Sequence, residues 1–281
     1  MTTRADRRPI GVFDSGVGGL TVLSELRRRL PHEATVYLGD NGRAPYGPRA
    51  AEDVRAFTAE CIAWLLAQDE KLVVVACNTA TAQALPLVRE QSDVPVVGVV
   101  RPGAVAAAAA TRDGHVGVVA TSGTVASGAY PAAITEANPA IVVSQQACPT
   151  LVPLVEAGVV DGPQAEREVR GYLEPMLAQD PRIDALLLGC THYPLLRATI
   201  ERVVGRSVAV VDSAFTTAIA VEDLLDALRA RRDLTGSGAA DNRIATTGDV
   251  AAFTAVAERV FGDRLPDVES VSVEAAVSSK A

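Results

Sequence analysis

Two stretches of the sequence share one pattern: LVVVACNTAT at residues 72–81 and LLLGCTHYP at residues 186–194. In each, an apolar run is followed by a small residue, a cysteine and then polar side chains. A short continuous apolar run with polar flanks is typical of a strand that is buried on both faces of a parallel sheet. Cys77 and Cys190 are therefore expected at the carboxyl ends of strands, where α/β sheets bind ligands.

The same alternation continues along the chain. Helix-length segments with a 3.6-residue period, such as residues 48–68, separate most of the short apolar runs. This order predicts βαβ units and a mostly parallel sheet, and therefore an α/β fold. The expected strands lie at 10–13, 35–39, 72–76, 94–99, 115–120, 140–147, 185–189, 208–212 and 242–247.

Two short strings occur twice at similar intervals. GVFDSGVGG at 11–19 resembles GVVATSGTV at 117–125, and ACNTATA at 76–82 resembles GCTHYPL at 189–195. The repeat indicates two related α/β halves, with the two cysteines at equivalent strand ends. A ligand bound between the halves would meet one thiol on each side.

Composition excludes several classes of protein. Hydrophobic residues make up 48% of the 281 residues and charged residues 21%, which is typical of a globular protein. No apolar run reaches the length of about 18 residues that a membrane span needs, and the polar start argues against a signal peptide and for the cytoplasm. The net charge of −8 argues against a nucleic-acid partner, because the arginine runs at 27–29 and 229–232 lie near the expected ends of helices.

The chain also lacks the usual ligands for common cofactors. It has only two lysines, Lys71 and Lys280, and neither is placed to form a Schiff base, which argues against pyridoxal phosphate. A zinc site takes about four ligands, and the Cys and His residues are too sparse to supply them. Neither a cofactor nor a metal is therefore expected. His32 and His115 are expected in solvated turns.

Other cysteines and loops allow more than one interpretation. Cys61 is expected in a helix core, and Cys148 in the core or in a site wall. The glycine-rich turn at 14–19 is either a plain strand-to-helix turn or an anion site at a helix start. The loop at 39–49 is either a surface turn or a cover over a small ligand.

The two repeated cysteines also have two interpretations. Cys77 is either a buried thiol next to a helix that Asn78 or Thr79 caps, or a thiol whose pKa the helix dipole lowers from about 8.5. Cys190 precedes a possible cap, Thr191, and its neighbour His192 could activate or orient the thiol.

The strings FDSGVGGLTV, GDNGRAPYG, ACNTAT and LGCTHYPLL together resemble the glutamate racemases, from about residue 10 to about residue 262. The resemblance implies two similar three-layer α/β domains with pseudo-symmetry and an active site at their interface. It implies a cytoplasmic enzyme that interconverts L- and D-glutamate without a cofactor and supplies D-glutamate for peptidoglycan. It also implies a possible homodimer.

The resemblance assigns roles to individual residues. Cys77 would deprotonate D-glutamate and Cys190 L-glutamate, with Asp14 and His192 assisting the thiols. Asp40 and Glu156 are weaker supporting matches, and Thr121 and Thr124 could add hydroxyls from the second domain. The substrate-contacting positions implied are Ser15, Tyr46, Gly47, Asn78, Thr79 and Thr191.

Three alternatives remain open, of which the third is a non-enzymatic binding protein with this fold. The first is an aspartate racemase or a broader amino-acid racemase, although aspartate racemases usually have Glu where His192 stands. The second is a thiol hydrolase or transferase with a Cys190–His192 dyad, which leaves Cys77 unexplained. The expected domains comprise residues 1–100 with 213–281, and residues 101–212.

Overall fold

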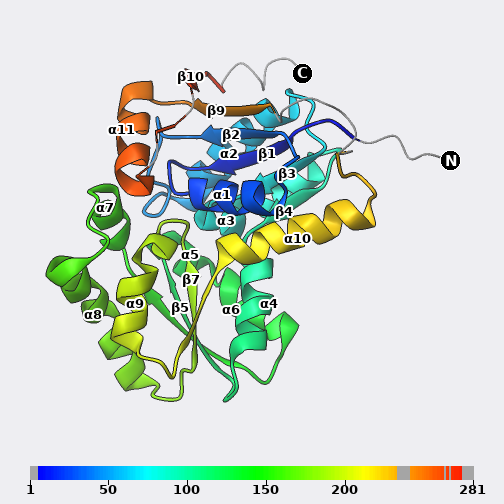
Figure 1. Cartoon of the computed structure of the whole chain (residues 1–281). Coiled ribbons are helices and arrows are strands. Elements are labelled where there is room, and N and C mark those ends of the chain that lie inside the picture. Colours follow the sequence, from blue (N-terminus) through cyan, green and yellow to red (C-terminus); the bar gives the residue numbers. More distant parts are fainter. Residues whose placement is uncertain (1–5, 233–240, 263, 266, 274–281) are drawn as a thin grey trace.

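Two parallel sheets form the core of the described chain, which comprises residues 6–232, 241–262, 264–265 and 267–273 of the computed structural model (Figure 1). The first sheet has the strand order β10-β9-β2-β1-β3-β4. Its strands are β1 (Ile10–Asp14), β2 (Thr35–Gly39), β3 (Leu72–Val75), β4 (Val96–Gly98), β9 (Asn242–Thr246) and β10 (Val268–Ser270). Lys280 and residues 1–5 lie outside the described residues.

The second sheet has the order β6-β5-β7-β8, and every strand pair in both sheets is parallel. Its strands are β5 (His115–Ala120), β6 (Val142–Ala147), β7 (Ala185–Gly189) and β8 (Ala209–Asp212). This order repeats the β2-β1-β3-β4 part of the first sheet, so the α/β class and the two similar halves are confirmed.

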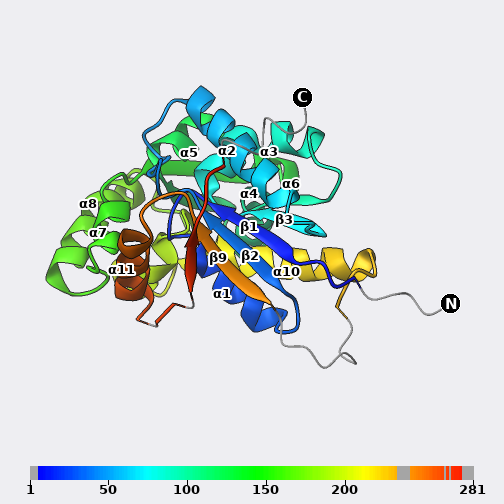
Figure 2. The same cartoon turned by 90° about the horizontal axis from the view of Figure 1, so that it is seen from above.

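Helices cover both faces of each sheet, because consecutive strand side chains point to opposite faces. In β7, Leu186 and Leu188 pack into one apolar cluster, whereas Ala185 and Leu187 pack into another. The helices on the first sheet are α1 (Leu20–Arg29), α10 (Ser213–Ala227) and α11 (Val250–Phe261) on one face, and α2 (Ala51–Leu66) and α3 (Asn78–Glu90) on the other (Figure 2).

The second sheet is covered in the same way. On one face lie α7 (Leu151–Glu156), α8 (Gly162–Gln179), the 3₁₀ helix η1 (Tyr193–Leu196) and α9 (Arg197–Val204). On the other lie α4 (Val100–Ala110) and α6 (Ala129–Ala137), with the short α5 (Ser122–Ser127) at the junction of the sheets.

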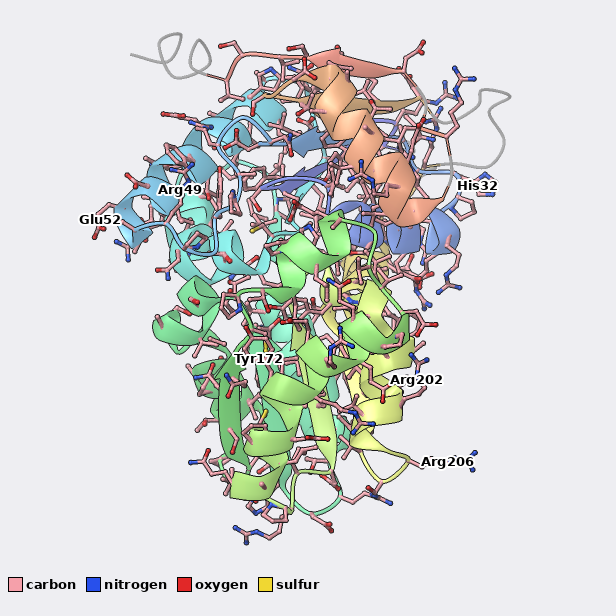
Figure 3. The ribbon with its side chains drawn as sticks, turned by 90° about the vertical axis from the view of Figure 1, so that its left-hand side faces the viewer. His32, Arg49, Glu52, Tyr172, Arg202 and Arg206 are labelled. Atoms are coloured by element: carbon pink, nitrogen blue, oxygen red, sulfur yellow. The ribbon has the colours of Figure 1, made fainter. Side chains whose placement is uncertain are left out.

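Some local expectations were wrong. His115 is not solvated: it is the first residue of β5, only 5% exposed, and its Nδ1 lies 2.8 Å from Asp180 Oδ2. His32 does lie at the surface (Figure 3). Residues 27–29 end α1 as expected, but α10 ends at Ala227, so residues 229–232 follow the helix. None of the described helices is both long and apolar enough to span a bilayer.

Candidate active site

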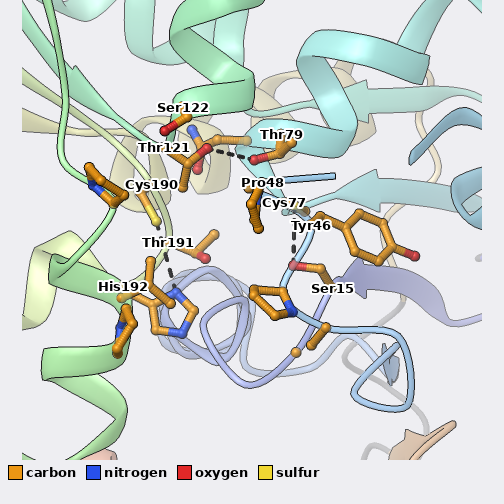
Figure 4. A pocket seen from close by; sticks show the side chains of 18 of the residues that line it. Ser15, Tyr46, Pro48, Cys77, Thr79, Thr121, Ser122, Cys190, Thr191 and His192 are labelled. Carbon is orange, nitrogen blue, oxygen red and sulfur yellow. Dashed lines mark hydrogen bonds between the residues drawn. The ribbon is translucent and has the colours of Figure 1, made fainter. Parts of the chain in front are cut away.

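A cavity of about 370 Å³ lies where the carboxyl ends of the strands of both sheets meet (Figure 4). All of the site residues predicted from the sequence line it except Asp14, Asp40 and Thr124. The predicted residues that line it are Ser15, Tyr46, Gly47, Cys77, Asn78, Thr79, Thr121, Glu156, Cys190, Thr191 and His192.

Cys77 ends the loop after β3 and is itself the N-cap of α3. The backbone N–H of Ala80 donates to its Sγ at 3.4 Å, so the expectation that Asn78 or Thr79 caps the helix was wrong. The helix begins one residue earlier than that expectation required, which places the sulfur over the free N–H groups.

Of the two interpretations of Cys77, the one in which the helix dipole lowers its pKa was wrong. Burial and the nearby carboxylate of Asp14 raise its pKa to about 12. They outweigh the hydrogen bond that Cys77 accepts from the Ala80 N–H and its contact with Ser15, whose Oγ lies 3.5 Å from Sγ. Loss of hydration disfavours the charged thiolate more than a single helix start favours it. Cys77 is therefore a protonated thiol at neutral pH.

Cys190 lies on the other side of the cavity, directly after β7, and has a different environment (Figure 4). Its Sγ is 3.9 Å from Nδ1 of His192, and Nε2 of His192 is 3.0 Å from Oε1 of Glu156. Burial alone would lower the pKa of His192, but its hydrogen bonds to the Cys190 sulfur and to Glu156 raise the pKa to about 10. The imidazolium form of His192 can therefore donate a hydrogen bond to the Cys190 sulfur. Thr191 does not cap the following turn, because His192 occupies the N-cap position of η1.

Asp14 is buried behind the cavity wall. Its Oδ2 accepts a hydrogen bond from the N–H of Gly16 at 2.9 Å, and burial raises its pKa. The negative charge of the Asp14 carboxylate lies close to Cys77 and contributes to the raised pKa of that thiol. Asp14 thus influences the cavity without lining it.

Asp40 anchors the loop that follows β2. Its carboxylate accepts hydrogen bonds from the hydroxyl of Tyr46, from Nε of Arg43 at 2.8 Å and from Oγ1 of Thr247 at 2.5 Å. The Tyr46 hydroxyl therefore points away from the cavity, and its ring and backbone form part of the wall (Figure 4). Residues 44–48 of this loop line the cavity, so the interpretation of the loop as a ligand cover is favoured over a plain surface turn.

Hydroxyl and amide groups close the junction between the sheets. Oγ1 of Thr79 lies 2.8 Å from that of Thr121 and 3.2 Å from that of Thr124, so Thr79 of the first half contacts two threonines of the second half. The backbone N–H of Gly123 donates to the carbonyl of Gly47 at 2.9 Å. Thr124 is fully buried beneath this contact and supports the wall from behind.

The glycine-rich turn after β1 packs directly against the Cys190 loop. A Cβ added at Gly18 would lie 2.4 Å from Thr191 Oγ1 and 2.5 Å from the ring of His192. In the first turn of α1, the hydroxyl of Thr21 is shared between two backbone carbonyls, that of Gly18 at 2.8 Å and that of Thr191 at 3.0 Å. The first half of the chain thus fixes a loop that belongs to the second.

Some residues that line the cavity were given no individual role in the sequence analysis. Cys148 is buried and does not line it, so the possible wall role of Cys148 was wrong. The wall comes instead from the prolines and valine that follow it, for which the sequence analysis made no prediction. The lining residues without a predicted role are Gly16, Ala44, Pro45, Pro48, Ser122, Pro149, Val152 and Pro153.

Two thiols that end equivalent strands and share one cavity define a class of amino-acid racemase. The family model for Asp/Glu/hydantoin racemase matches residues 15–223, and the chain belongs to that family. Within this family, the similar curated proteins are glutamate racemases. The glutamate racemase of Oceanobacillus iheyensis is 48% identical over 256 residues, which cover 90% of this chain and 92% of that protein. The chain thus belongs among the glutamate racemases.

Solved structures agree with this assignment. The glutamate racemase of Thermus thermophilus, in complex with β-chloro-D-alanine, has a TM-score of 0.86 and 45% identity, and covers 96% of this chain and 99% of its own. That of Francisella tularensis, in complex with D-glutamate, has a TM-score of 0.88 and 33% identity, with the same coverage. An aspartate racemase of Picrophilus torridus, 20% identical with a TM-score of 0.57, shares the fold.

Proposed function

We propose that this protein interconverts L- and D-glutamate by moving the α-proton between two thiols without a cofactor. The observation that carries the proposal is that Cys77 and Cys190, from different sheets, line one cavity in a chain so similar to glutamate racemases. Inversion at one carbon needs a base on one face and an acid on the other, and two fixed groups supply both without rearranging the substrate.

The different environments of the thiols set the starting state for one direction. In this proposal Cys190 reacts as the base beside the His192 ring, whose Nδ1 lies 3.9 Å from its sulfur, and the high pKa of Cys77 keeps the proton of that thiol in place. The Cys190 thiolate then takes the α-proton of L-glutamate, and the Cys77 thiol delivers its own proton to the opposite face. D-glutamate requires the reverse state, with Cys77 as the thiolate.

The remaining groups stabilise the charge that develops on the substrate. A turnover of about 10 per second corresponds to a barrier of about 16 kcal/mol, although the α-proton is very weakly acidic. Backbone N–H groups at the start of α3 and hydroxyls of Ser15, Thr79 and Thr121 lie around the cavity and can donate to a carboxylate that becomes enediolate-like. Ser15, Tyr46, Gly47, Asn78, Thr79 and Thr191 are the substrate contacts in this proposal.

The wider biological role follows from the product. The D-glutamate would supply peptidoglycan synthesis in the cytoplasm. The enzyme would act as a homodimer. The chain would divide into residues 1–100 with 213–281, and residues 101–212, because the chain passes from the first sheet to the second after β4 and returns after β8. Light scattering of the purified protein measures the oligomeric state directly.

The decisive experiment compares cysteine variants without added pyridoxal phosphate. Cys77→Ala and Cys190→Ala should each abolish racemisation, and the serine variants should bind glutamate but lose most of the rate, because a hydroxyl is a far poorer base. Exchange of the α-proton with deuterated solvent, followed from each enantiomer, identifies the face that each thiol serves. Full racemisation by either alanine variant would refute the two-thiol mechanism.

The Cys190–His192–Glu156 arrangement also favours a second candidate, a thiol hydrolase, since nucleophilic cysteine enzymes use a thiol, an imidazole and an orienting group. That function has no use for Cys77. Trapping of an acyl group on Cys190 by an activated ester, with turnover unaffected in Cys77→Ala, would favour this candidate over the racemase.

A further inference from the structure

Tyr130, in α6, is a fully buried tyrosine whose hydroxyl meets a residue of the other half of the chain. Nδ2 of Asn78 donates to the Tyr130 hydroxyl at 2.7 Å and to Oγ of Ser213 at 3.3 Å. Asn78 follows Cys77 directly and lines the cavity, whereas Tyr130 does not line it. The hydroxyl therefore reaches the Cys77 side of the site from behind.

The ring of the same tyrosine contacts the Cys190 side. A Cβ added at Gly189 would lie 2.7 Å from Cε2 of Tyr130, so the ring fills the space that a side chain would need. Gly189 is the last residue of β7 and directly precedes Cys190. One side chain thus touches the neighbour of each thiol.

The hydrogen bonds also fix the orientation of the Asn78 amide. Its nitrogen is held by two hydroxyls, while Oδ1 has no hydrogen-bond partner among the described residues. A buried amide that loses one of two partners pays a desolvation cost and is free to turn. Because proton transfer requires reacting atoms within a few tenths of an ångström of their best positions, such a turn disturbs the cavity wall beside Cys77.

We propose that Tyr130 is a positioning residue that holds the Cys77 and Cys190 sides of the cavity in register through Asn78 and Gly189. The inference rests on the proposed racemase function and adds a residue that does not touch the substrate. Its hydroxyl and its ring act on different sides of the site, so the hydroxyl can be removed while the ring remains.

The test variant is Tyr130→Phe, and its matched control is Tyr172→Phe, which removes a tyrosine hydroxyl bonded at 3.0 Å to Thr150 on the outer side of the second sheet (Figure 3). Tyr130→Phe should lower kcat about tenfold in both directions, the rate equivalent of one hydrogen bond. It should also raise the primary isotope effect with α-deuterated glutamate, because proton transfer becomes more rate-limiting. A mere loss of folded enzyme leaves the isotope effect unchanged. Tyr172→Phe should match the wild type.

A double-mutant cycle with Asn78→Ala tests whether the hydroxyl acts through the amide. In that background, Tyr130→Phe should cost less than twofold further. Additive losses, or an unchanged isotope effect in Tyr130→Phe, would overturn the role of Tyr130 while a racemising wild type upholds the proposed function. A wild type that fails to racemise glutamate would overturn both.

Discussion

Gly18→Ala tests the contact between the two halves of the site with a single methyl group. Gly18 does not have a positive φ, so alanine can adopt its backbone conformation without strain. The added Cβ would nevertheless lie 2.4 Å from Thr191 Oγ1 and 2.5 Å from Nδ1 and Cε1 of His192, where ordinary contacts begin at 3.4 Å. The Cys190 loop must therefore retreat by about 1 Å.

The size of the effect follows from which atoms must move. Nδ1 of His192 is the atom that lies 3.9 Å from the sulfur of Cys190, and a misplacement of about 1 Å costs about 100-fold in rate. Overpacking at a buried site costs about 1–3 kcal/mol of unfolding free energy, which lowers Tm by about 2–10 °C in a chain of this size. We expect both losses together.

The assay is racemisation of each glutamate enantiomer, followed by circular dichroism, with Tm measured on the same samples. Because the enantiomers have equal free energies, kcat/KM must fall equally in both directions, which checks the data internally. Gly171→Ala is the control: it lies within α8, a Cβ there meets nothing within 4 Å, and activity should be unchanged. A Gly18→Ala enzyme within threefold of wild-type kcat/KM would refute the reasoning.

Three further predictions concern groups around and away from the cavity. Glu156→Gln should lower the pKa of His192 from about 10, as measured by ¹⁵N NMR of the ring, because one of the hydrogen-bonding charges that raise it is lost; an unchanged pKa would contradict the pairing. Thr21→Val should lower kcat/KM about threefold to tenfold, because it removes the hydrogen bond to the Thr191 carbonyl. A variant with wild-type kcat/KM and a lower Tm would show that this bond contributes to stability alone. Glu70, 2% exposed and with neither carboxylate oxygen hydrogen-bonded within the described residues, has a pKa raised by burial from 4.5 to about 7. The stability that depends on a protonated Glu70 is fully present below about pH 4.5 and is lost as the pH rises to about 7. Glu70→Gln should therefore raise the unfolding free energy at pH 8 by about 1–3 kcal/mol. Chemical denaturation that shows no gain at pH 8 would contradict this.

Strands were the part of the fold that could be predicted best. The runs at 35–39, 115–120 and 185–189 coincide with β2, β5 and β7 residue for residue, because strands buried on both faces need continuous apolar side chains. β10 was not predicted: its three residues, VES, carry no apolar run, and it forms only by pairing with β9. Tertiary pairing defined this strand, and local composition did not.

Within the site, the cysteines and their neighbours could be predicted because they directly follow recognisable strands. The pKa of Cys77 could not, because its sign depends on how much water the fold removes from the sulfur and on Asp14, which approaches from another strand. His115 was misjudged for a similar reason. Its partner Asp180 is distant in sequence, and only the packed sheet brings the two side chains together.

The pairing of β9 with β2 has a consequence for synthesis of the chain on the ribosome. Thr35 and Asn242 are neighbours in the finished sheet, yet all of the second sheet is translated between them. β2 therefore emerges with an open edge that stays unpaired until almost the whole polypeptide has been made. The edge of β2 that β9 covers in the finished sheet is therefore exposed through most of synthesis.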